Sequence, residues 1–168
     1  FKDLLELGWI NRMPKLMGVQ AAGSAYLYEA WQNDEDVLTK PPIKAATIAD
    51  SISAGLPRDR LKAMRAVRET QGAFISVTDE EILAAIPALA RPTGVFAEPA
   101  GAAAYAGLVK AVNEGLVSAN ERIVVINTGS GLKDVASAMK AVEQVGTQPQ
   151  RVEPSLAALE QLIERNKE

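Results

Sequence analysis

Two short segments of the sequence combine the residue types that could bind a small polar ligand. Glu98 stands before a proline and a run of alanines, and Thr128 begins the sequence TGSG. A threonine hydroxyl and the unhindered N–H groups of glycines suit polar ligand atoms that approach close to the backbone. Each segment also has a simpler explanation, because TGSG is typical of a tight turn and Glu98 suits the positive end of a helix dipole.

The composition removes several other kinds of chemistry. The chain contains neither cysteine nor histidine, which excludes disulfides, thiolate nucleophiles, the commonest general base and the commonest zinc ligands. We therefore predict no metal site. Lys133 and Asp134 follow the glycines and could contact a ligand, but the solvated start of a helix explains both charges, and we assign them no catalytic role.

Charge and hydropathy limit the partners of the chain. The net charge is −3, with lysines and arginines interspersed among acids, so no basic face is expected to bind nucleic acid. The sequence lacks an apolar run of about 18 residues that could span a membrane, and its start lacks the pattern of a signal peptide. We expect a cytoplasmic protein that binds neither nucleic acid nor membrane.

Hydrophobic patterning predicts short strands that alternate with helices. The expected strands are residues 15–20, 73–77, 95–97, 122–127 and 150–152, and the expected helices are residues 1–10, 24–31, 58–71, 79–91, 98–113, 134–145 and 155–166. Thr78 is the expected N-cap of the fourth helix, and Pro87 is expected to kink or shorten it. The alternation predicts an α/β fold with an open, mainly parallel twisted sheet and helices on both faces.

The predicted topology also indicates where a ligand would bind. Ligands of open α/β sheets bind beyond the carboxyl ends of the strands, and Glu98 and Thr128 each follow a predicted strand. Residues 33–57 form a long, linker-like loop, which could lie across a site or simply follow the surface. The first helix begins in mid-pattern without a capping residue, so we expect further chain upstream.

Several segments of the sequence resemble one enzyme family. The segments EPAGAAAYAGLVKAVNEG (98–115) and VVINTGSGLKD (124–134) are similar, in this order and at this separation, to the end of the threonine synthases and their fold-type-II pyridoxal-phosphate relatives. Further similar segments are FKDLLELGWINRMPKLMGVQAAG (1–23), TIADSISAGLP (47–57) and VTDEEILAAIPALAR (77–91). The resemblance extends to about Ala141 and implies the carboxyl-terminal part of a catalytic domain of the tryptophan synthase β type, in which residues 146–168 add a short strand and a helix.

The resemblance implies pyridoxal 5'-phosphate as the cofactor and gives four residues a place beside it. Thr128 would be the hydroxyl partner of the pyridine nitrogen, with Gly129 next to it and with Glu98 and Ala100 near the ring. A neutral hydroxyl does not hold a proton on that nitrogen, which tempers the ring as an electron sink. The family's Schiff-base lysine and glycine-rich phosphate loop have no match here, so we assign no catalytic residue and expect this chain to be inactive alone.

The implied reaction of the parent enzyme is the conversion of O-phosphohomoserine and water to threonine and phosphate. A threonine or serine dehydratase is an alternative, because EPAGA also occurs in those enzymes and because Gly101 and Ser130 depart from residues common in the synthases. The segment TIADSISAGLP favours the synthases. A non-catalytic α/β binding module is the alternative from another class. We expect a small amino-acid substrate, a homo-oligomer such as a dimer, and self-association of a chain with exposed strand edges.

Overall fold

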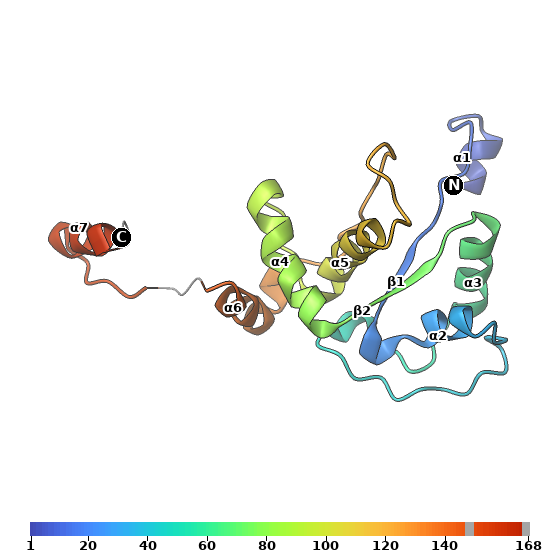
Figure 1. Cartoon of the computed structure of the whole chain (residues 1–168), viewed down its shortest axis with the longest axis horizontal. Helices are drawn as coiled ribbons and strands as arrows, with labels where there is room; N and C mark the ends of the chain where they lie inside the picture. Colours follow the sequence, from blue (N-terminus) through green and yellow to red (C-terminus); the bar gives the residue numbers. More distant parts are fainter. Residues whose placement is uncertain (147–149, 166–168) are drawn as a thin grey trace.

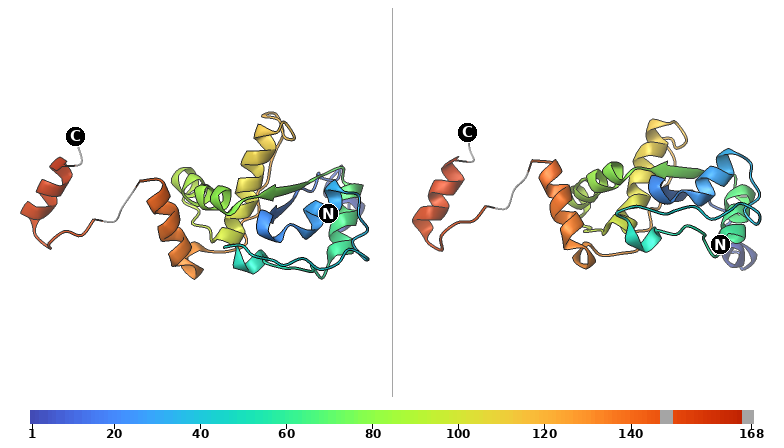
Figure 2. Two further views of the ribbon diagram at one scale, coloured as in Figure 1. Left: turned by 60° about the horizontal axis from the view of Figure 1, so that its bottom comes forward. Right: turned by 90° about the horizontal axis from the view of Figure 1, so that it is seen from below.

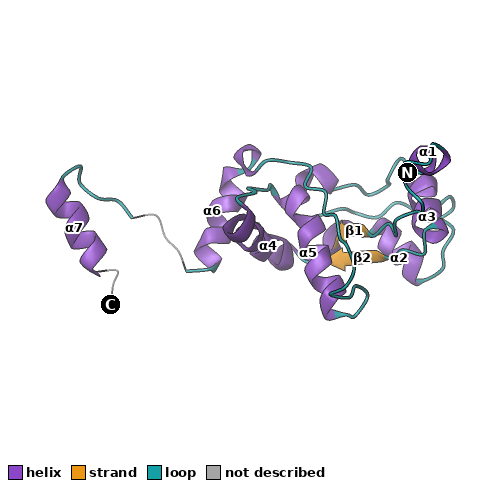
Figure 3. Ribbon diagram, turned by 90° about the horizontal axis from the view of Figure 1, so that it is seen from above, coloured by secondary structure: helices purple, strands orange, loops and turns teal. Residues whose placement is uncertain are grey.

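A two-stranded parallel sheet forms the centre of the molecule. The computed structural model describes residues 1–146 and 150–165 (Figure 1). Strand β1 (Gly18–Ala21) pairs in parallel with β2 (Phe74–Val77), with Gly18 opposite Phe74 and Ala21 opposite Val77. Viewed from above, the two strands lie between α5 on one side and α2 on the other (Figure 3). The predicted α/β class with a parallel sheet is therefore confirmed, although the sheet is smaller than expected.

Alternate side chains of the strands enter two separate cores. Val19 and Ile75 pack with α4 (Asp79–Thr93) and α5 (Pro99–Asn113). Phe74 packs instead with α2 (Tyr26–Gln32) and α3 (Arg60–Glu69), and its ring centroid lies 5.8 Å from that of Trp31. This period of two is the geometry of a strand buried on both faces. Helices accordingly cover both faces of the sheet.

The remaining helical elements are shorter or lie further from the sheet. They are α1 (Lys2–Glu6), η1 (Ala22–Ser24), η2 (Asp50–Ile52), η3 (Gly131–Lys133), α6 (Val135–Gln144) and α7 (Leu156–Arg165). Helix α6 packs against α4, whereas α7 lies apart from the other helices in every view (Figure 2). In the described residues, no helix is both long and apolar enough to cross a membrane.

Helix α4 begins as predicted but continues further than predicted. The Thr78 side chain accepts a hydrogen bond from the Glu81 N–H while the Glu81 carboxylate accepts one from the Thr78 N–H, which completes a capping box. The expected shortening at Pro87 is wrong, because the helix runs on to Thr93. Pro87 is buried in a helix that packs against both α5 and α6, and this packing offsets the backbone hydrogen bond that proline cannot donate.

Three predicted strands and the last four residues of the first predicted helix do not form. Residues 122–127 and 150–152 are irregular, and of residues 95–97 only Ala97 forms an isolated bridge, antiparallel to Ser130. Strands require a partner, and among the described residues none pairs with 122–127 or 150–152. Helix α1 ends early because Gly8, with φ of +71°, closes it in a Schellman motif. The other helices form, and Asn166 of the last one lies outside the described residues.

The loop of residues 33–57 is fixed to the core at several points. The Ser24 hydroxyl accepts a hydrogen bond from the Ala54 N–H at 2.9 Å. The Asp79 carboxylate accepts hydrogen bonds from the Thr47 hydroxyl at 2.5 Å and from the Ile48 N–H at 3.1 Å. Since Asp79 opens α4, these contacts join the loop to the carboxyl end of β2. The loop is therefore held along the sheet edge where a site is expected.

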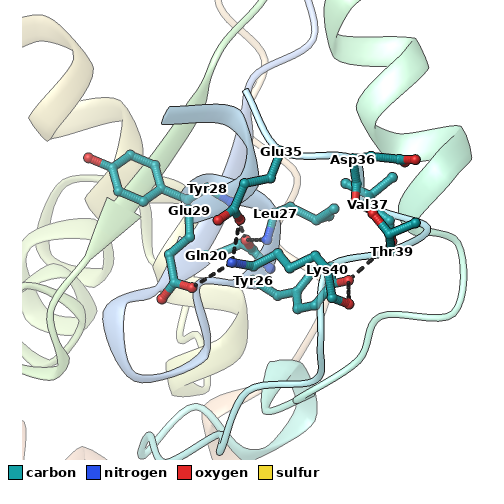
Figure 4. A network of polar contacts seen from close by, with 10 residues as sticks. All are labelled: Gln20, Tyr26, Leu27, Tyr28, Glu29, Glu35, Asp36, Val37, Thr39 and Lys40. Carbon is teal, nitrogen blue, oxygen red and sulfur yellow. Dashed lines mark hydrogen bonds and ion pairs between the residues drawn. The ribbon is translucent and has the colours of Figure 1, made fainter. Parts of the chain in front are cut away.

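Lys40 provides a further attachment of this loop, shown in Figure 4. Its ammonium lies 2.5 Å from the Glu35 carboxylate and 3.3 Å from that of Glu29, over the ring of Tyr26. The Tyr26 hydroxyl lies 3.1 Å from the carbonyl oxygen of Val37 and 2.8 Å from that of Lys40. Only 9% of the Lys40 side chain is exposed. The loop thus buries a paired cation against α2.

Replacing Lys40 by methionine tests this attachment. The hydrogen bond to Glu35 raises the pKa of Lys40 above its usual 10.5, against the opposing effect of burial. A raised pKa in the folded state contributes stability that is present below pH 10.5 and is lost as pH rises through the raised value. K40M is expected to lower the free energy of unfolding by about 1 kcal/mol at neutral pH.

The measurement is urea denaturation at neutral pH and above pH 10.5, since the loss in the alkaline range should be smaller in K40M than in wild type. Lys44→Met is the matched control, because Lys44 lies in the same loop with an exposed side chain. Equal alkaline losses in K40M and wild type would remove Lys40 from this role.

Candidate functional site

The two segments singled out in the sequence lie against each other. Backbone hydrogen bonds join Glu98 N to Gly129 O at 3.1 Å and Gly131 N to Phe96 O at 2.9 Å. They flank the isolated bridge between Ala97 and Ser130. The turn before α5 and the turn before η3 are therefore a single backbone unit, although about 30 residues separate them in the sequence.

Two glycines leave room for side chains where the two turns touch. A Cβ atom on Gly129 would lie 1.8 Å from Oε1 of Glu98, and one on Gly101 would lie 2.1 Å from Oδ1 of Asn127. Both distances are far shorter than any van der Waals contact, so side chains from one turn fill the space left by the glycines of the other. The glycine of the TGSG segment therefore does more than allow a tight turn.

Glu98 is a buried acid that does not cap its own helix. Only 8% of its side chain is exposed, and its carboxylate makes no capping hydrogen bond to α5. The side chain lies over Gly129 instead, and Oε1 is 3.2 Å from Nζ of Lys133. Glu98 is therefore a buried acid that also occupies the N-cap position of α5, and its place beside a ligand stays a prediction.

The other predicted residues lie on the same unit in different environments. Thr128 is exposed, whereas Ala100 is buried in the first turn of α5. The Ser130 hydroxyl accepts a hydrogen bond from the Leu132 N–H at 3.3 Å, which starts η3. An exposed hydroxyl, small residues and a buried carboxylate thus share one backbone unit.

Lys133 and Asp134, which the sequence suggested to be a solvated helix start, differ in the structure. The Asp134 carboxylate accepts a hydrogen bond from the Ser137 N–H at 3.0 Å, and hydrogen bonding from Ser137 lowers the pKa of Asp134. Asp134 is therefore the predicted helix-start residue. Lys133 is solvated as predicted, with 61% of its side chain exposed, but its ammonium also pairs with the buried Glu98, a contact that the sequence did not predict. Asn127 also belongs to the site and was not predicted, since only the packing reveals its contact with Gly101.

The segment TIADSISAGLP borders the same region. Its short helix η2 contacts α5, and Ile48 and Ile52 pack against the core that contains Ala97 and Ala100. The carboxyl end of β1, this segment and the start of α5 therefore lie along one side of the domain (Figure 2). This is the side on which α/β sheets bind their ligands.

Residues 2–129 match the family described as "Pyridoxal-phosphate dependent enzyme". The chain belongs to this family. The match covers both turns up to Gly129 and implies pyridoxal phosphate as the cofactor of the enzyme. The predicted resemblance is thereby confirmed at the level of the family.

Several curated relatives of this chain within the pyridoxal-phosphate-dependent family are threonine synthases. Threonine synthase from Mycobacterium tuberculosis is 41% identical over 162 residues, which cover 96% of this chain and 42% of the relative. Threonine synthase from Methanocaldococcus jannaschii is 38% identical over 164 residues, covering 97% of this chain and 39% of the relative. Threonine synthase from Synechocystis is 42% identical over 134 residues, covering 80% and 32%. The chain spans about two fifths of the length of the first two relatives.

A solved structure confirms the fold. The processed form of threonine deaminase isoform 2 from Solanum lycopersicum aligns with a TM-score of 0.65 over 86% of this chain and 39% of that chain, at 22% sequence identity. At this identity the likeness concerns the fold alone. It agrees with a chain that contains part of the α/β architecture of a pyridoxal-phosphate-dependent enzyme.

The residues of the site fit the ring end of this cofactor. The pyridine nitrogen needs one polar partner, and the exposed hydroxyl of Thr128 provides a neutral one. The flat ring needs small neighbours, and Gly129 and Ala100 have almost no side chain to obstruct it. The chemistry of the residues present therefore agrees with the family match.

Proposed function

We propose that this chain is part of a threonine synthase that converts O-phosphohomoserine and water to threonine and phosphate. The observation that carries the proposal is the identity of 38–42% to threonine synthases over 80–97% of the chain. Family membership favours an enzyme over a non-catalytic binding module. Threonine and serine dehydratases remain the alternative within the family.

In this proposal the chain supplies the ring end of the cofactor site. The Thr128 hydroxyl would bind the pyridine nitrogen, Gly129 and Ala100 would leave room for the ring, and Glu98 would lie near it. Bound pyridoxal phosphate supplies an electron sink for elimination and replacement at the substrate carbons. Because Thr128 is neutral, it orients the ring without holding a proton on the nitrogen.

The proposal also requires parts of the enzyme that this sequence does not contain. The lysine that binds the cofactor covalently and the loop that binds its phosphate would come from outside the 168 residues, so the chain alone is inactive. We further propose a cytoplasmic homodimer. The net charge of −3 and the interspersed charges fit an enzyme of small-molecule metabolism better than a nucleic-acid-binding protein.

A product assay on the full-length protein that contains this sequence tests the activity. Incubation with O-phosphohomoserine should release phosphate and threonine in equal amounts, while incubation with threonine or serine should release little 2-oxo acid. The opposite pattern would make the enzyme a dehydratase. Absence of both products from a protein that binds pyridoxal phosphate would reject both assignments.

Replacing Thr128 by aspartate is expected to change both spectrum and turnover. A carboxylate at this position would hold a proton on the pyridine nitrogen, which strengthens the ring as an electron sink and alters the balance between reaction steps. We expect kcat for phosphate release to fall about 100-fold, as for loss of a positioned polar group at a reacting centre. The absorption maximum of the bound cofactor should shift as well.

Thr128→Ser is the matched control, because serine keeps the hydroxyl and should retain the wild-type spectrum and most of the rate. An unchanged spectrum together with an unchanged rate in T128D would remove Thr128 from the ring nitrogen.

A further inference from the structure

The ion pair between Glu98 and Lys133 joins the two turns of the site through side chains. Glu98 precedes α5 and Lys133 ends η3, and their charged atoms lie 3.2 Å apart. The exposures of the partners differ greatly, because 8% of the Glu98 side chain is exposed against 61% of the Lys133 side chain. A buried carboxylate is thus held by a cation that water still reaches.

Such a pair acts mainly on the buried partner. Ionised carboxylates are costly to bury without a compensating charge or hydrogen bond. Helix α5 does not supply that compensation, since the Glu98 side chain makes no capping hydrogen bond to it. Lys133 is the partner that the structure records for this carboxylate. Without the ammonium, the Glu98 carboxylate would lose this partner and would rotate toward water.

The Glu98 side chain also holds the backbone turn that carries Thr128. Its Oε1 occupies the space where a side chain of residue 129 would be, so the carboxylate lies directly against the Gly129 backbone. The Glu98 N–H also donates to Gly129 O. Movement of the carboxylate would therefore release the backbone beside the Thr128 hydroxyl.

We propose that Lys133 is a positioning residue that acts through Glu98 to hold the Thr128 turn in place for the cofactor ring. The inference rests on the proposed function, because it takes Thr128 as the partner of the ring. Lys133 itself contacts neither cofactor nor substrate. Lys133 should therefore affect kcat and the absorption spectrum of the bound cofactor, but not the affinity for substrate.

The variants Lys133→Met and Lys133→Arg in the full-length protein test this role. K133M should lower kcat by about 10- to 100-fold, as expected when a reacting group is misplaced by a fraction of an ångström. KM for O-phosphohomoserine should stay within about twofold, because no interaction with substrate is lost. K133M should also shift the absorption maximum of the bound cofactor, and K133R should restore both readouts in large part. Lys140→Met is the matched control, because Lys140 is an exposed lysine of α6 outside the site.

A double-mutant cycle between K133M and Glu98→Gln provides a readout that is independent of activity. In urea denaturation, the two single changes should be non-additive by about fivefold in the equilibrium constant of unfolding. Additive effects, or K133R as impaired as K133M, would overturn the proposal. A rise in KM with unchanged kcat would also overturn it, because Lys133 would then bind substrate directly.

These outcomes are distinct from failure of the proposed function. If wild type released no phosphate from O-phosphohomoserine, the proposed reaction would be rejected. The cycle and the cofactor spectrum would still report whether Lys133 positions Glu98. Coupling in the cycle without any spectral shift in K133M would leave a purely structural ion pair and would overturn the positioning role.

Discussion

Replacement of Gly23 by alanine is expected to lower the free energy of unfolding by about 2–4 kcal/mol, the range for overpacking at a site that cannot relax. An added Cβ atom would lie 1.7 Å from the carbonyl oxygen of Ala46 and 2.8 Å from its carbonyl carbon. These are backbone atoms, and the Ala46 N–H donates to Gly23 O at 2.8 Å. The two backbones must therefore separate before the new side chain fits.

The measurement is urea denaturation of G23A followed by circular dichroism. Ala22→Ser is the matched control, because Ala22 is exposed in the same short helix η1 and the change should remain within about 0.5 kcal/mol. The variant should lose activity as well as stability, since this contact holds the loop at the carboxyl end of β1. A stable G23A protein would show that the loop is less closely packed than described.

The second large effect concerns the apolar strip, which we define as Ile123, Val124, Ile126 and Leu132. All four side chains are exposed, Val124 by 88% and Ile126 by 68%. In the part of the chain that the structure describes, residues 122–127 make no backbone–backbone hydrogen bond. An extended apolar segment with unpaired backbone groups favours pairing with another chain. We expect the 168-residue chain to self-associate when expressed alone.

The double variant Val124→Glu with Ile126→Glu is expected to weaken self-association by at least about 100-fold, because two apolar side chains that association would bury are replaced by charges. Light scattering after size-exclusion chromatography over a wide concentration range measures the effect. Leu38→Glu is the control, since Leu38 is also an exposed apolar residue, at 56%, but lies in the 33–57 loop. A wild-type chain that stays monomeric throughout would contradict the prediction.

The helices could be predicted from the sequence because their signals are local. The capping box at Thr78 and Pro99 at the start of α5 place both helix starts where patterning predicted them. The shortening expected at Pro87 is absent for a non-local reason, because the packing that stabilises α4 comes from α5 and α6. Helical periodicity predicts which face is buried but not how strongly its neighbours hold it.

The strands could be predicted less well, because their formation depends on distant parts of the chain. Residues 122–127 have the composition of a buried strand, but a strand exists only with a partner that its own sequence does not contain. The pairs of β1 and β2 lie 56 residues apart in every register position, from Gly18 with Phe74 to Ala21 with Val77. Apolar runs alone therefore predicted a strand at residues 122–127 just as they did at β1 and β2, although 122–127 has no partner among the described residues and forms no strand.

The candidate site was likewise predictable only in part. Residue types identified Glu98 and Thr128 as candidates, and their predicted positions after strands placed them at one edge of the sheet. The contact between the two turns and the pairing of Lys133 with Glu98 depend on the folded chain. A lysine next to an aspartate at a helix start is commonplace, so no local signal distinguished Lys133.

The close approach of Glu98 and Gly129 constrains which substitutions the site can accept during evolution. A residue larger than glycine at position 129 can be accommodated only if the Glu98 side chain moves, and one at position 101 only if the Asn127 side chain moves. Single substitutions in either turn are therefore expected to be disfavoured, while compensating pairs are tolerated. Positions in the two turns should therefore covary among related sequences, although they are far apart in the chain.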